Sequence, residues 1–214
     1  CRFPASGWIK MNNNPYLDQH ALLSNVPAEL RALPQWICWA AEPKKDGGLA
    51  KKPRLPWKPD AKAWNDPANA TTFEAALEAA EAHGYGIGFL LANGYVGVDF
   101  DVNDKVVENA CAYLGSYTET SPSRRGRKTI LRLNGWRPSM QVPPEDSPWR
   151  GKAECHVSGF FTITGWKCDN SPSEIASGAD KLEAWWTTIC AEREIESTFE
   201  RDKQMVTQIG RAHV

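Results

Sequence analysis

Two short apolar segments separated by a glycine-containing turn constrain the fold of this chain more than any other feature. Residues 86–91 and 95–102 are apolar except for Asp99 and Asp101, and Gly94 lies in the turn between them. Apolar segments around a short turn of this kind predict a buried β-hairpin. Because side chains alternate along a strand, we expect Asp99 and Asp101 to lie together on one face, while their apolar neighbours face the core.

These carboxylates are candidate metal ligands. Two carboxylates a few ångströms apart repel each other unless a cation lies between them. Asp99 and Asp101 therefore indicate a site for a hard divalent cation, and an acidic turn that only closes the hairpin is the structural alternative. Glu154 begins a later apolar segment after a basic loop, and a third carboxylate on a neighbouring strand would complete a site for Mg²⁺ or Mn²⁺. The alternative for Glu154 is a strand-edge ion pair with Lys152.

Cations gather in two segments of a chain that is otherwise close to neutral. The formal net charge is −1 over 214 residues, which excludes a uniformly basic surface for binding polyanions. Residues 44–58 and 124–152, however, are rich in Lys and Arg and contain few acids. Local basic surfaces of this kind suit a nucleotide or nucleic-acid groove, and solvated loops are the structural alternative.

Residues 116–128 combine hydroxyl groups, cations and a glycine in a short polar segment. Such a segment can surround a phosphate with hydroxyls, backbone N–H groups and positive charge. An exposed turn before the following strand is the alternative.

Helix and strand signals alternate along the chain without a regular βαβ repeat, which predicts an α+β domain around a largely antiparallel sheet. We expect one domain over residues 26–192, an uncertain extension over 1–25 and a linker or tail over 193–214. Residues 209–214 resemble a translated sequencing adapter, so we expect the natural protein to continue past residue 208. The expected helices cover residues 26–33, 71–83, 106–114 and 180–192, and the expected strands cover 35–41, 128–133 and a pair at 154–157 and 160–164, with loops over 42–70 and 137–150.

Cysteine usage and hydropathy exclude further classes. The six cysteines form no CxxC pair, which argues against a zinc ribbon or a redox motif. Cys38, Cys111 and Cys155 stand in apolar surroundings and are typical of reduced core thiols. We find no signal peptide and no apolar segment long enough to span a bilayer, and we expect a cytoplasmic protein without a membrane partner.

Seven pieces of the sequence, in this order, resemble a known family. They are Pro27-Ala28-Glu29-Leu30 with Leu33-Pro34-Gln35-Trp36; Lys52-Pro53; Asn65-Asp66-Pro67; Thr72-Phe73-Glu74-Ala75-Ala76 with Gly86-Ile87-Gly88-Phe89; Val98-Asp99-Phe100-Asp101; Ser116-Tyr117-Thr118-Glu119 with Ser121-Pro122-Ser123 and Gly126; and Glu154 with Phe161-Thr162-Ile163-Thr164-Gly165. The family is the primase–polymerase domain of the archaeo-eukaryotic primase superfamily, in the form found on phages, plasmids and integrated elements. The similarity extends from Val26 to Trp166, and the last three pieces resemble its catalytic motifs.

This resemblance implies a fold and an activity. The implied fold is α+β, with an RRM-like, antiparallel-rich catalytic sheet and an N-terminal α/β extension. The implied activity is that of a template-dependent DNA primase/polymerase, a nucleotidyltransferase that uses two divalent ions, Mg²⁺ or Mn²⁺. Its implied partners are a single-stranded DNA template, nucleoside triphosphates and a helicase domain or protein C-terminal to this chain.

The resemblance also implies a role for each candidate residue. The metal-binding catalytic residues are Asp99, Asp101 and Glu154. The residues that hold the triphosphate are Ser121, Ser123, Arg125 and Lys128. The candidates for contacts with the template backbone are Lys51, Lys52 and Arg54.

The chain departs from the family pattern in its second and third motifs. Lys128 stands where the family has a histidine that contacts the nucleotide, and Arg124 stands at a usual glycine. An arginine of the third motif is missing at Ser158-Gly159. A catalytically weakened nucleic-acid-binding module of a replication initiator is therefore the first alternative. A metal-dependent nuclease is the second, because two aspartates and a glutamate also serve phosphodiester hydrolysis.

Overall fold

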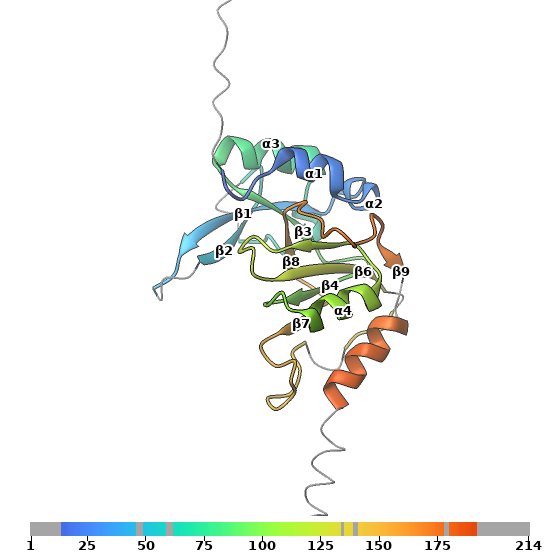
Figure 1. Cartoon of the computed structure of the whole chain (residues 1–214). Helices are drawn as coiled ribbons and strands as arrows, with labels where there is room; N and C mark the ends of the chain where they lie inside the picture. Colours follow the sequence, from blue (N-terminus) through green and yellow to red (C-terminus); the bar gives the residue numbers. More distant parts are fainter. Residues whose placement is uncertain are drawn as a thin grey trace, which may run out of the picture.

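The computed structural model describes residues 14–45, 49–58, 62–133, 135–138, 141–177 and 180–191. The first part of the expected N-terminal extension and the expected tail over 193–214 lie outside the described residues. The fold is mixed α+β, as predicted, with two antiparallel sheets and helices packed on them (Figure 1).

The elements alternate along the chain. The helices are α1 (Gln19–Asn25), α2 (Ala28–Arg31), α3 (Phe73–His83), α4 (Lys105–Leu114), a helix over 180–191 and the 3-10 turn η1 (Pro67–Asn69). The strands are β1 (Trp36–Pro43), β2 (Leu49–Arg54), β3 (Gly86–Leu90), β4 (Tyr95–Phe100), β5 (Thr118–Thr120), β6 (Arg127–Arg132), β7 (Ala153–His156), β8 (Phe160–Ile163) and β9 (Ala176–Ser177).

The first sheet has the strand order β2-β1-β3-β8, with antiparallel neighbours, and helices α1, α2 and α3 lie against it (Figure 1). Its core is aromatic. The ring of Trp36 packs edge-on against Phe73 of α3 at 4.9 Å and against Phe89 of β3 at 5.3 Å. The expected loop over 42–70 contains β2, so that expectation was wrong there. Three cations and a proline among its six residues leave β2 without the apolar alternation that signals a strand.

The second sheet has the order β5-β6-β4-β7, and β9 pairs in parallel with β6. Helix α4 and the helix over 180–191 cover one face of this sheet, where Val98, Phe100, Val107, Leu182 and Trp186 form a core. The strand order and directions are those of the split βαβ arrangement, with β4-α4-β5-β6 followed by β7. The described part of the connection from β6 to β7 is a loop, and the helix over 180–191 supplies the second helix on this face.

Both expected hairpins were wrong. Strands β3 and β4 belong to different sheets, and so do β7 and β8. The connecting turns contain residues with positive φ, Asn93 (55°), Gly94 (88°) and Gly159 (88°), and each turn directs the chain into the other sheet instead of reversing it. The two turns lie side by side, since the backbone N–H of Leu91 donates to the carbonyl of Gly159 at 2.9 Å.

As a result, the bent segment formed by β3 and β4 runs antiparallel to the bent segment formed by β7 and β8. Strand β3 pairs with β8, and strand β4 pairs with β7. The bend places the ring of Phe161 from β8 directly over Gly97 of β4, where a Cβ atom would lie 2.4 Å from the ring. This pairing joins the two sheets. The face of β4 on which Asp99 lies is therefore next to the place where the sheets meet.

Helices α3 and α4 begin within two residues of their predicted starts and end at the predicted residues, whereas α1 was not predicted and α2 is shorter than the helix expected over 26–33. Asp104 caps α4 by accepting from the N–H of Val107, and Gly115 ends it in the left-handed conformation. Thr72 caps α3 by accepting from Ala75, one residue later than the predicted start.

Gly126→Ala tests how closely β6 approaches β4. A Cβ atom at residue 126 would lie 2.0 Å from the carbonyl oxygen of Phe100, and β4 cannot withdraw without losing its pairing. We expect the free energy of unfolding to fall by about 3 kcal/mol or more. Gly151→Ala is the control: its φ is 70° but its Cβ would meet nothing within 4 Å, so left-handed strain should cost only about 1–2 kcal/mol. Equal losses in denaturant unfolding would contradict the close approach.

Candidate functional site

Four charged residues lie in one row across the second sheet. The register places Glu119 of β5 opposite Lys128 of β6, Lys128 opposite Asp99 of β4, and Asp99 opposite Glu154 of β7. Directly opposed residues share a face, so all four side chains emerge on the face that is not covered by α4. Asp101 follows Asp99 by two residues at the end of β4. The expectation that Asp99 and Glu154 lie on neighbouring strands is therefore confirmed.

Lys128 is the buried centre of this row. Its Nζ donates to Oδ2 of Asp99 at 2.6 Å and lies 4.1 Å from the centroid of the Phe161 ring. The Lys128 side chain is only 4% exposed, against 24% for Asp99. A charge removed from water in this way needs compensation, which the carboxylate and the electron-rich ring face supply together.

His156 lies beside Glu154. Its Nε2 is 3.3 Å from Oε2 of Glu154, and its ring centroid is 5.7 Å from that of Phe161. Burial lowers the pKa of His156, although the charges of Asp99 and Glu154 act in the opposite direction. The suggested ion pair between Glu154 and Lys152 is not the arrangement found, because Lys152 Nζ lies 3.7 Å from the carboxylate of Asp104.

The carboxylates influence one another. Partial desolvation, and then the charges of Asp99 and Glu154, raise the pKa of Asp101. Lys51 of β2 also interacts electrostatically with this group. Desolvation and repulsion from Lys128 lower the pKa of Lys51, while the charges of Asp99 and Asp101 act to raise it. The cluster thus includes a cation from the first sheet.

A groove of about 600 Å³ opens next to Asp101. This volume is within the usual range for small-molecule sites. Its lining brings together four of the residues predicted from the sequence with the aromatic side chains of the N-terminal region. The lining residues are Tyr16, Trp39, Leu49, Lys51, Asp101, Pro122, Ser123 and Arg125.

The predicted phosphate-binding residues in and after the loop before β6 do not all lie at the groove. Ser121 is buried, and its hydroxyl accepts from the N–H of Gly126 at 3.2 Å, so it holds the turn. Ser123 and Arg125 instead line the groove. The guanidinium of Arg124 lies 4.0 Å from the centroid of the Trp166 ring. Lys128 is adjacent to the carboxylates, as its predicted position requires, but it is paired with Asp99.

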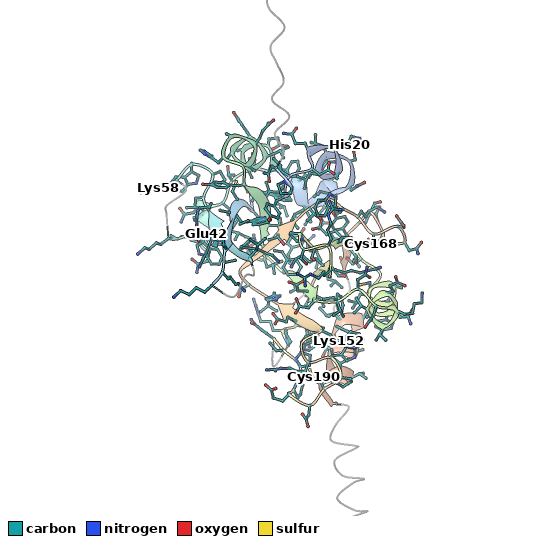
Figure 2. All side chains as sticks on the ribbon, turned by 60° about the vertical axis from the view of Figure 1, so that its left-hand side comes forward. His20, Glu42, Lys58, Lys152, Cys168 and Cys190 are labelled. Atoms are coloured by element: carbon teal, nitrogen blue, oxygen red, sulfur yellow. The ribbon has the colours of Figure 1, made fainter. Side chains whose placement is uncertain are left out.

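The three predicted template-binding residues do not share one surface. Alternation along β2 puts Lys52 and Arg54 on the face opposite to Lys51. The guanidinium of Arg54 pairs with Glu42, which Figure 2 shows on the side of the molecule that also carries Lys58. Of these three, only Lys51 lines the groove. Lys152 lies toward the other end of the molecule (Figure 2), where its backbone carbonyl accepts from the N–H of Asp101 at 3.0 Å.

The donor set fits a hard divalent cation, although among the described residues no three His, Cys, Asp or Glu side chains are already arranged as a metal site. Asp99, Asp101 and Glu154 offer carboxylate oxygens, the ligands that Mg²⁺ and Mn²⁺ prefer. Lys128 engages one oxygen of Asp99, and His156 lies against one oxygen of Glu154. The assignment of a metal to these residues stays a prediction.

The sequence did not assign a role to His156 or to Phe161. His156 follows Glu154 by two residues, so strand alternation was the signal that could have placed both on one face. Phe161 comes from a different sheet, and no local pattern indicated its contact with Lys128.

At the other end of the row, Glu119 is completely buried and satisfied by the backbone. Its carboxylate accepts from the N–H groups of Thr164 at 2.8 Å and Gly165 at 3.0 Å, and from the hydroxyl of Tyr117 at 2.8 Å. Burial raises the pKa of Glu119 to about 6, despite these hydrogen bonds to its charged form. Glu119 thus ties β5 to the chain that leaves β8.

Glu119 should make the stability of the fold depend on pH. Because its pKa is higher in the folded state (about 6) than its ordinary value of 4.5, the folded chain holds this proton more tightly. Its contribution is complete at low pH and is lost as the pH rises through 6, a loss of about 2 kcal/mol in the free energy of unfolding.

We expect denaturant unfolding of Glu119→Gln to vary less with pH across this interval than that of the unaltered chain. Glu183→Gln, an exposed change on the helix over 180–191, is the control and should keep the original pH dependence. An unchanged pH dependence in Glu119→Gln would be inconsistent with the raised pKa.

None of the described helices has the length and apolar character needed to cross a membrane. Comparison of the chain with protein-family models and with curated protein sequences found no match.

Proposed function

We propose that this chain is a nucleotidyltransferase of the primase–polymerase type, a template-dependent DNA primase/polymerase of a phage, plasmid or integrated element. One observation carries the proposal: Asp99 and Glu154 are paired on adjacent strands, and Asp101, two residues after Asp99, lines a groove that Arg125 and Lys51 also line. Carboxylates next to cations, on a sheet with split βαβ order, suit the transfer of a phosphoryl group.

The residues would divide the work by their chemistry. Asp99, Asp101 and Glu154 would hold Mg²⁺ or Mn²⁺, which when bound supplies a Lewis acid for the developing charge of phosphoryl transfer. Arg125 and Lys51 would bind the polyphosphate electrostatically, with the hydroxyl of Ser123 as a hydrogen-bonding partner.

The resemblance to this family implies the remaining partners. A single-stranded DNA template would bind through phosphate contacts that depend on salt. Nucleoside triphosphates are the substrates, and a helicase domain or protein would lie C-terminal to this chain. We place such a replication enzyme in the cytoplasm.

A second candidate function is a nucleic-acid-binding module with weakened catalysis. The observation that favours it is the 2.6 Å contact between Lys128 and Asp99. The buried ammonium of Lys128 binds an oxygen of Asp99 that a metal ion would need as a ligand, and its positive charge also repels such an ion.

Asp99→Asn separates the two functions. The change keeps the shape of the side chain but removes its charge, so we expect incorporation of labelled nucleotides on a single-stranded DNA template, with Mg²⁺ or Mn²⁺, to fall by about 100-fold or more. Binding of the same DNA should change little. Asp104→Asn is the matched control, because asparagine also caps a helix and Asp104 caps α4.

The outcomes distinguish the candidates. DNA binding without incorporation by the unaltered chain would favour the weakened module, and degradation of the template would favour a nuclease. A full rate in Asp99→Asn would refute the role of Asp99 in catalysis.

A further inference from the structure

Lys128 carries an inference that rests on the proposed function. Its Nζ stands 2.6 Å from a carboxylate oxygen predicted to bind a metal. The Phe161 ring closes over it from the first sheet, and the side chain is almost inaccessible to water. We propose that Lys128 is a built-in cation that takes the place of one of the two expected divalent ions, so that the site binds a single divalent ion.

The position of Lys128 is fixed by the fold. It lies directly opposite Asp99 in the antiparallel register, with Phe161 above it. The ring can approach because Gly97 has no side chain, since a Cβ atom there would lie 2.4 Å from the ring. An ammonium that is paired with a carboxylate and covered by an aromatic ring packed on Gly97 does not swing away to admit an ion at the same oxygen.

The charges support one ion rather than two. The carboxylates of Asp99, Asp101 and Glu154 together with the ammonium of Lys128 carry two negative charges, which one divalent ion neutralises. A second divalent ion would leave an excess of positive charge within a few ångströms of Lys128, where Coulomb repulsion is strong. Lys51 adds to this repulsion from the groove.

The carboxylates also differ in access. Asp99 is bound to Lys128, whereas Asp101 is exposed at the end of β4 and borders the groove. The Glu154 side chain is 42% exposed, and its Oε2 lies 3.3 Å from Nε2 of His156. The single ion therefore belongs on the groove side of these carboxylates, with Asp101, Glu154 and the oxygen of Asp99 that Lys128 does not engage.

Equilibrium Mn²⁺ binding, followed by electron paramagnetic resonance, measures the stoichiometry directly. We expect one Mn²⁺ per unaltered chain. In Lys128→Met, which keeps much of the side-chain volume without the charge, we expect a second Mn²⁺ or an affinity for the first that is higher by about tenfold or more. Lys128→Arg keeps the charge and should retain one ion, and Lys105→Met, on the helix that covers the opposite face of the sheet, is the control for a cation outside the site.

Two bound ions in the unaltered chain would overturn the inference, even if Lys128→Met does not fold. So would equal stoichiometry and affinity in Lys128→Met. Incorporation of nucleotides with two ions bound would overturn this inference and leave the proposed function intact. One bound Mn²⁺ without any incorporation would support the inference and count against the proposed function.

Discussion

The register of the second sheet is the constraint on which the rest of the structure depends. It aligns Glu119, Lys128, Asp99 and Glu154 across four strands, with acids on both sides of one lysine. If one strand slipped by one residue, its charged side chains would face the apolar core under α4. Burying those charges without partners would lower the stability of the fold. The alternation of apolar and charged residues that specifies this register is therefore the same feature that assembles the candidate site.

The bend between the sheets brings side chains of the first sheet next to this row of charged residues. If β3 and β4 formed an ordinary hairpin, the face of β4 that carries Asp99 would have no partner sheet. Because each turn passes the chain from one sheet to the other, Phe161 of β8 lies over Gly97 and Lys128. The ring excludes water on one side of the lysine, while Asp101 at the strand end stays exposed. One sheet thus holds a partly buried ion pair, Lys128 with Asp99, and an accessible carboxylate two residues after Asp99.

Local patterns predicted some of the elements but missed α1, β2 and β5, and distant pairing decided how the elements are arranged. Periodicity and capping predicted α3, α4 and β6 because those signals depend on neighbours in sequence. Asn93-Gly94 fits both a reversing turn and a bend, so the choice between them came from the pairing of β4 with β7, more than fifty residues away. Alternation likewise placed Asp99 with Asp101. No pattern within one segment could show that Lys128 would pair with Asp99, or that the hydroxyl of Ser121 would accept a hydrogen bond from Gly126 within its own turn.

Anomalous diffraction of Mn²⁺ in crystals of the chain tests the single-ion site most directly, because it locates the ion and the lysine together. We expect one anomalous peak at Asp101 and Glu154, with Lys128 still bound to Asp99. Two peaks among these carboxylates, or an ion on Asp99 with Lys128 displaced, would contradict it. An absence of any peak there, at Mn²⁺ concentrations that saturate binding in solution, would contradict the metal site itself.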